Sequence, residues 1–96
     1  MVGLNNRLKM LRKERHMTQV QVAHRVGVTK AMISAYETAT RSPSYDILIR
    51  LAHVFGVTTD YLLGIDSRRM IDVTKMDEKE IELVVRIIDA LKKKKE

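Results

Sequence analysis

The stretch TQVQVAHRVGVTKAMISAYE, residues 18–37, decides the fold. Its first half predicts a short helix that begins after Thr18 as N-cap and ends at Gly27, where a left-handed C-cap costs least. The apolar stripe of this helix is formed by Val20, Val22, Ala23 and Val26. Ala23 is small, as expected where two helices approach closely.

The second half of the stretch predicts another helix directly after the first. Thr29 offers an N-cap, and Ile33 and Tyr36 mark a buried face that reaches roughly to Glu37. Two short helices joined by a three-residue turn with a glycine form a helix-turn-helix. In that layout the first helix crosses the DNA backbone and the second enters the major groove.

Helical patterns continue on both sides of this stretch. Apolar spacing predicts helices from Leu4 to about Arg15, from Ser44 to Gly56 and from Thr58 to about Gly64. No segment alternates between polar and apolar residues as a strand would. We therefore expect an all-α domain of five short helices within residues 1–64.

The ordered set of residues in this region resembles the Cro/CI-type (XRE) helix-turn-helix regulators. The resemblance rests on Thr18-Gln19, Ala23, Gly27-Val28-Thr29, Ile33-Ser34, Tyr36-Glu37, Arg41, Pro43-Ser44, Leu48, Leu51-Ala52, Phe55-Gly56-Val57-Thr58 and Asp60-Tyr61-Leu62-Leu63-Gly64. It covers about two thirds of the chain and implies a lambda-repressor-like DNA-binding domain with double-stranded DNA as its partner.

The second helix of the motif supplies the predicted base-reading residues. Because Ile33 and Tyr36 face the core, the opposite side carries Lys30, Ala31, Ser34 and Ala35. Lys30 can donate to guanine, Ser34 can donate or accept, and the alanine methyl groups can pack against thymine methyl groups. Alternatively, the two alanines only permit close approach. This sparse set suggests that shape readout contributes to specificity.

The predicted phosphate contacts lie at helix starts and in the polar loop that follows. They are Thr18, Gln19, Thr29, Thr40 and Arg41. For Gln19 the resemblance implies the same role.

Several neighbouring residues are expected to be structural. Met32 is interpreted as core, and Glu37 as the partner of an arginine from the first or fourth helix, such as Arg50. The basic residues Arg7, Arg12 and Lys13 are interpreted as solvated charge.

Two positions depart from the family pattern, which usually has glycine at both. At Ala39 either a left-handed cap costs about 1 kcal/mol or the loop takes another path. His16 tolerates a positive φ better than most residues do.

The last third of the chain predicts a connector, residues 65–75, and an amphipathic helix, residues 76–96. Asp77 and Glu80 form a capping-box-like start. The apolar face, Ile81, Val84, Val85, Ile88 and Leu91, favours dimerisation with an antiparallel twin over packing on its own domain, an alternative that stays open. A two-fold dimer would read two half-sites roughly 34 Å apart. The acidic first half of this helix argues against a membrane surface.

Charge and composition limit the function classes. The net charge is +6 and the pI about 9.8, and the excess falls on residues 1–64, which suits a polyanion. Without cysteines and with three scattered histidines, the sequence predicts no metal site and no cofactor. Nor does it offer a nucleophile with a base, so we expect no enzyme. The lack of a signal-like apolar run predicts a cytoplasmic protein.

Two functions remain open at this point. The first is a homodimeric repressor that reads a palindromic operator through the major groove and acts by occlusion, since no activation domain is recognisable. The second is an antitoxin-type interaction module that also represses its own operon. The sequence also allows a protein partner, either a toxin or an anti-repressor.

Overall fold

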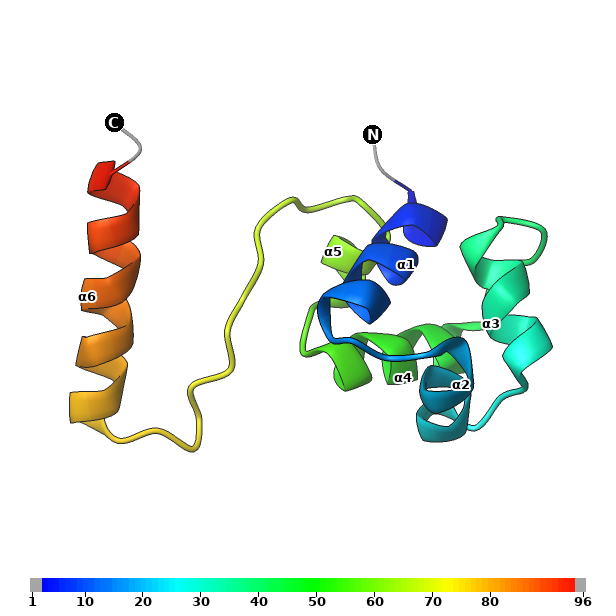
Figure 1. Cartoon of the computed structure of the whole chain (residues 1–96), viewed down its shortest axis with the longest axis horizontal. Helices are drawn as coiled ribbons and strands as arrows, with labels where there is room; N and C mark the ends of the chain where they lie inside the picture. The colour runs from blue at the N-terminus through cyan, green and yellow to red at the C-terminus, as the bar shows by residue number, and fades with distance from the viewer. Residues whose placement is uncertain (1–2, 95–96) are drawn as a thin grey trace.

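The computed structural model describes residues 3–94, and this part of the chain is entirely helical apart from loops (Figure 1). Its helices are α1 (Leu4–Glu14), α2 (Gln19–Val26), α3 (Lys30–Glu37), α4 (Tyr45–Phe55), α5 (Thr59–Leu62) and α6 (Glu78–Lys94). Every helix expected from the sequence is present, and the all-α fold is confirmed. Residues 1–2 and 95–96, at the outer ends of the predicted ranges, lie outside the described residues.

Four helices begin with the same hydroxyl cap. The side chains of Thr18, Thr29, Ser44 and Thr58 each accept a hydrogen bond from the backbone N–H three residues on. These bonds satisfy one of the N–H groups that the first turn of a helix leaves unpaired. The starts of α2 to α5 are therefore determined by residues close to them in the sequence.

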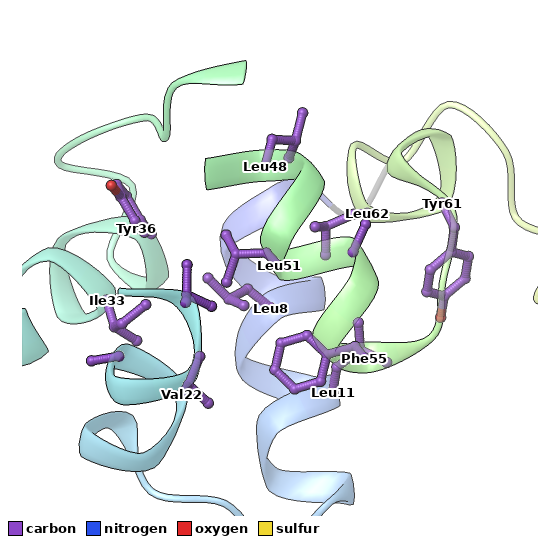
Figure 2. Packing of buried hydrophobic residues seen from close by; sticks show 13 residues of the cluster. Leu8, Leu11, Val22, Ile33, Tyr36, Leu48, Leu51, Phe55, Tyr61 and Leu62 are labelled. Atoms are coloured by element: carbon purple, nitrogen blue, oxygen red, sulfur yellow. The ribbon is translucent and has the colours of Figure 1, made fainter. Parts of the chain in front are cut away.

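Helices α1 to α5 enclose one core and are called the body here. Thirteen apolar residues from these helices are buried, with Phe55, Leu51 and Leu11 among the completely covered side chains (Figure 2). Met32 packs against this cluster, as expected. The only aromatic members are Phe55, Tyr36 and Tyr61, so aliphatic packing dominates.

Helix α6 stands apart from the body, on the far side of an extended segment (Figure 1). None of its described residues is buried. Packing of this helix on its own domain, the alternative kept open above, is not observed. Because α6 begins at Glu78, the connector comprises residues 65–77. The predicted cap is present, since Glu80 N donates to Asp77 Oδ1 at 2.8 Å and Asp77 N to Glu80 Oε1 at 3.1 Å.

Candidate nucleic-acid interface

Helices α2 and α3 are joined by the tight turn that the sequence predicts. Gly27 N and Val28 N both donate to Ala23 O, at 2.9 and 3.0 Å, and Gly27 adopts a left-handed φ of 82°. Ala23 is buried in the core, and α2 and α3 are in contact. A methyl side chain lets the helix backbones approach closely here. The pair forms a helix-turn-helix.

The two faces of α3 differ sharply in burial. Ile33 and Tyr36 are buried in the core, whereas Lys30 and Ala31 are exposed on the outer side. Ser34 and Ala35, one turn further along, are half-buried. The side predicted to read bases is therefore accessible, most of all at the N-terminal end of the helix.

The N-terminal ends of α2 and α3 bring predicted phosphate and base contacts together. Thr18, Gln19 and Lys30 line one shallow depression. The hydroxyl oxygens of Thr18 and Thr29 accept from Gln21 N at 3.1 Å and from Met32 N at 3.2 Å. As acceptors in these caps, both hydroxyls keep their O–H to donate elsewhere. Two helix starts, each favourable to anions, thus border the same surface.

Gln19 is held from within the body by a buried ion pair. Its Nε2 donates to Glu37 Oε1 at 3.3 Å, and the Glu37 carboxylate also accepts from Arg12 Nε at 2.7 Å and from Arg12 Nη2 at 3.0 Å. The side chains of Glu37 and Arg12 are only 3% and 13% exposed. This bidentate geometry raises the pKa of Arg12, chiefly through the hydrogen bonds with Glu37.

Two predictions about this network need correction. Glu37 does pair with an arginine of the first helix, but Arg50 is not its partner, because Arg50 Nη1 donates to Val26 O at 3.2 Å. Arg12 is not solvated charge. Its Nη1 also donates to Met17 O at 3.0 Å, so one guanidinium ties α1 to the start of α2 and the end of α3. The only sequence signal for this network is an acidic residue, Glu37, on the last turn of α3.

Two other arginines donate hydrogen bonds to backbone carbonyl groups near the ends of helices distant in the sequence. Arg15 Nη2 donates to Phe55 O at 2.8 Å and Arg7 Nη1 to Tyr61 O at 2.9 Å. Arg7 also lies over the Tyr61 ring, 4.3 Å from its centroid. The interpretation of Arg7 as solvated charge is therefore wrong, while Lys13 is exposed as expected. The bond from Arg15 pairs a carbonyl group at the end of α4, whereas Tyr61 O also accepts from Gly64 N at 3.0 Å.

The loop after α3 folds back on the last turn of that helix. Ala35 O accepts from Thr40 N at 3.0 Å, from Thr40 Oγ1 at 3.2 Å and from Arg41 N at 3.3 Å. Ala39 takes the left-handed conformation with φ 62°, and His16 does so with φ 55°. Both departures from the family pattern thus keep the path that glycine would favour. Thr40 and Arg41 are exposed beside α3.

Among residues 3–94 no helix is both long enough and apolar enough to span a bilayer. The same residues contain no cluster of three or more histidine, cysteine, aspartate or glutamate side chains that could hold a metal ion.

The fold and the exposed face of α3 define a helix-turn-helix protein of the lambda-repressor-like class. Residues 8–62 match the helix-turn-helix family, and the chain belongs to it. The transcriptional repressor RstR of the cryptic phage CTXphi of Vibrio cholerae is 32% identical over 96 residues, which cover 91% of this chain and 86% of RstR.

Further similarities lie in a regulator and in a solved repressor. The regulator ImmR of Bacillus subtilis is 34% identical over 80 residues, covering 83% of this chain. The chain spans 59% of ImmR and just over half of two other B. subtilis regulators that it matches. The P22 c2 repressor, solved in complex with a synthetic operator, superposes with a TM-score of 0.66 at 27% identity, covering 69% of this chain and 100% of that one.

Proposed function

We propose that this protein is a sequence-specific DNA-binding transcriptional repressor that places α3 in the major groove. The observation that carries the proposal is the accessible outer side of α3, bordered by two capped helix N-termini and Lys30. Support comes from RstR and the P22 c2 protein, both of which are repressors by name.

The residues divide into two roles in this proposal. Lys30 and Ser34 contact base edges, and the methyl groups of Ala31 and Ala35 pack against thymine methyl groups or allow close approach. Phosphate oxygens accept from the hydroxyls of Thr18 and Thr29, from Gln19 and, on the loop side, from Thr40 and Arg41. The N–H and the hydroxyl of Thr40 both donate to Ala35 O, so Thr40 would contact a phosphate only once its hydroxyl turns away from that carbonyl group.

The protein would act as a homodimer through α6. Ile81, Val84 and Ile88 are half-covered, while Val85 and Leu91 are 48% and 56% exposed. Two antiparallel copies of α6 can be aligned so that Arg86 of one copy is level with Arg86 of the other. Ile81 is then level with Leu91 of the second copy, and Val84 is level with Ile88. The first-turn acids Glu78 and Glu80 then face the lysines of the other helix's last turn.

A parallel pair would place like charges together at both ends of α6, so charge favours the antiparallel arrangement. The two-fold axis of such a dimer matches a palindromic operator with half-sites roughly 34 Å apart.

The test is selection of bound duplexes from a random pool, followed by affinity measurements at fixed salt. Replacing Lys30 and Ser34 by alanine should reduce discrimination at the corresponding bases by about 1–3 kcal/mol. Gln19→Ala should weaken every sequence alike. Lys75→Ala, in the exposed connector, is the charge-matched control for Lys30. If the Lys30 and Ser34 variants selected the same sequences with unchanged affinity, α3 would not be the reading helix.

A further inference from the structure

The connector begins as part of the body rather than as a loose tether. Ile65 N and Asp66 N both donate to Asp60 O, at 2.9 and 3.2 Å. Four residues further on, Arg69 Nη2 lies 3.0 Å from Glu14 Oε1 and Arg69 Nη1 lies 3.3 Å from Glu14 Oε2. This bidentate pair joins the connector to the last residue of α1 and raises the pKa of Arg69.

Arg69 makes a second contact with the body. Its guanidinium carbon lies 5.6 Å from the centroid of the Tyr61 ring, within the range of a cation–π interaction. Tyr61 is buried, and Arg7 contacts the same ring. The ring is therefore a fixed point of the body. Arg69 touches both α1 and α5 at once.

The neighbouring Arg68 provides a contrast within the same segment. It pairs with Asp66, two residues away, through Nε and Nη2 at 3.0–3.3 Å, and its side chain is 80% exposed. That pair is local to the connector and does not reach the body. After Arg69 the described hydrogen bonds of the connector are also local, from Thr74 to Asp72 and from Met76 N to Val73 O.

The contact at Arg69 shortens the reach of the connector. Residues 67–77, which follow the bonds to Asp60 O, could span at most about 38 Å if fully extended, whereas residues 70–77 alone could span about 28 Å. The contact at Arg69 therefore removes about 10 Å of reach from each chain of a dimer, against a separation of roughly 34 Å between adjacent half-sites on DNA.

We propose that Arg69 is a positioning residue, clamping the connector to α1 and α5 so that a dimer held together by α6 accepts only a narrow range of half-site spacings. This inference rests on the proposed function for its DNA consequence, but not for the clamp itself. Because the pair is half-exposed, with 41% of the Arg69 side chain and 44% of the Glu14 side chain accessible, salt should loosen it.

A distance measurement tests the clamp without DNA. The chain has no cysteine, so Lys9→Cys on α1 and Lys79→Cys on α6 give two unique, exposed sites for nitroxide labels. Labelled protein is mixed with excess unlabelled protein, so that only distances within one chain are detected by pulsed electron spin resonance. We expect Arg69→Ala and Glu14→Gln to widen the distance distribution at least twofold, and Arg68→Ala to leave it unchanged.

Two further comparisons with the same labels test whether the contact is an ion pair. Sodium chloride at high concentration should widen the distribution of the parent chain but not that of Arg69→Ala. Exchanging the charges, with Glu14→Arg and Arg69→Glu together, should restore much of the narrow distribution. Equal widths for the parent chain, Arg68→Ala and Arg69→Ala would overturn the clamp.

The DNA consequence is tested on operators whose half-site spacing is altered in single base-pair steps. For the parent chain and Arg68→Ala, we expect a tenfold or greater loss of affinity when the spacing changes by two base pairs. For Arg69→Ala the loss of affinity caused by the same change in spacing should be at least three times smaller than for the parent chain. Identical spacing profiles for the two arginine variants would refute the positioning role. Since the label distances need no DNA, failure of the clamp and failure of the proposed function are distinguishable.

Discussion

The body and α6 are both built from amphipathic helices, yet they treat their apolar residues in opposite ways. In the body, thirteen apolar side chains are buried within one chain. In α6, Leu83, Val85, Ile87 and Leu91 are between 48% and 58% exposed, and no described residue of this helix is buried. In proteins most of the stability of a helix comes from packing of its amphipathic face. From this difference we expect the body to fold alone and α6 to gain stability from a second surface.

The body and α6 also differ in how their charged residues are arranged. Residues 1–64 have nine lysines and arginines against four acids, but four of those arginines, Arg7, Arg12, Arg15 and Arg50, bond to groups of the body. Only Arg12 meets a carboxylate there, so the other three still contribute their charge to the long-range field. In α6 the acids gather in the first turn and the lysines in the last.

A pair of leucines measures the contrast most directly. Leu51→Ala removes a completely buried side chain and should lower the free energy of unfolding of the body by about 4 kcal/mol, because a cavity remains in the core. Leu91→Ala, at a half-exposed site, should change it by less than about 0.5 kcal/mol. Urea unfolding followed by circular dichroism provides both values. Similar losses for the two variants would mean that α6 belongs to the same cooperative unit as the body.

Ion pairs allow a second comparison. Glu37→Gln leaves the Arg12 charge buried without its counter-charge and should destabilise the body by about 3 kcal/mol. Glu82→Gln breaks the exposed pair with Arg86 on α6 and should cost no more than about 0.5 kcal/mol. Thermal unfolding of both variants at one protein concentration tests this. A loss below 1 kcal/mol for Glu37→Gln would show that the buried pair contributes little.

The apolar face of α6 can be tested through the oligomeric state. Ile88→Asp places a carboxylate at the centre of the predicted contact and should weaken dimerisation about a hundredfold, or about 2.7 kcal/mol, while the body stays folded. Asp89→Asn, next to it on the polar side, is the control. Sedimentation equilibrium gives the dissociation constants. A chain ending at Gly64 should be monomeric, and an unchanged dimer from that chain would exclude α6 as the contact.

The sequence predicts the elements of the body well because their signals are local. Hydroxyl caps, left-handed glycines and apolar spacing each act within about four residues, and every expected helix is observed. The outer side of α3 follows from the same periodicity once Ile33 and Tyr36 are assigned to the core.

The partners of the long arginine side chains could not be predicted from the sequence. The Arg12 and Glu37 partners are 25 residues apart, and Arg69 and Glu14 are 55 apart. Helical periodicity does not record such pairs, since a guanidinium on a flexible stem can reach several elements. Charge alone favours Arg50 as a partner of Glu37, but Arg50 donates to Val26 O at the end of α2 instead.

The smallest predicted effect lies in the loop after α3. Ala39 has φ 62°, a conformation that glycine adopts without steric strain. Ala39→Gly should therefore stabilise the body by about 0.5–1 kcal/mol, the relief of strain outweighing the greater entropy of the unfolded chain. Neither the dissociation constant of the dimer nor the position of α3 should change.

Thermal unfolding measures this gain, and Ala31→Gly, in the first turn of α3, is the matched control that should lose stability instead. If Ala39→Gly lowered the melting temperature, hydrogen bonds of the loop, such as those to Ala35 O, would outweigh the backbone strain at this position. The strain would then be a minor feature of a loop that holds Thr40 and Arg41 beside α3.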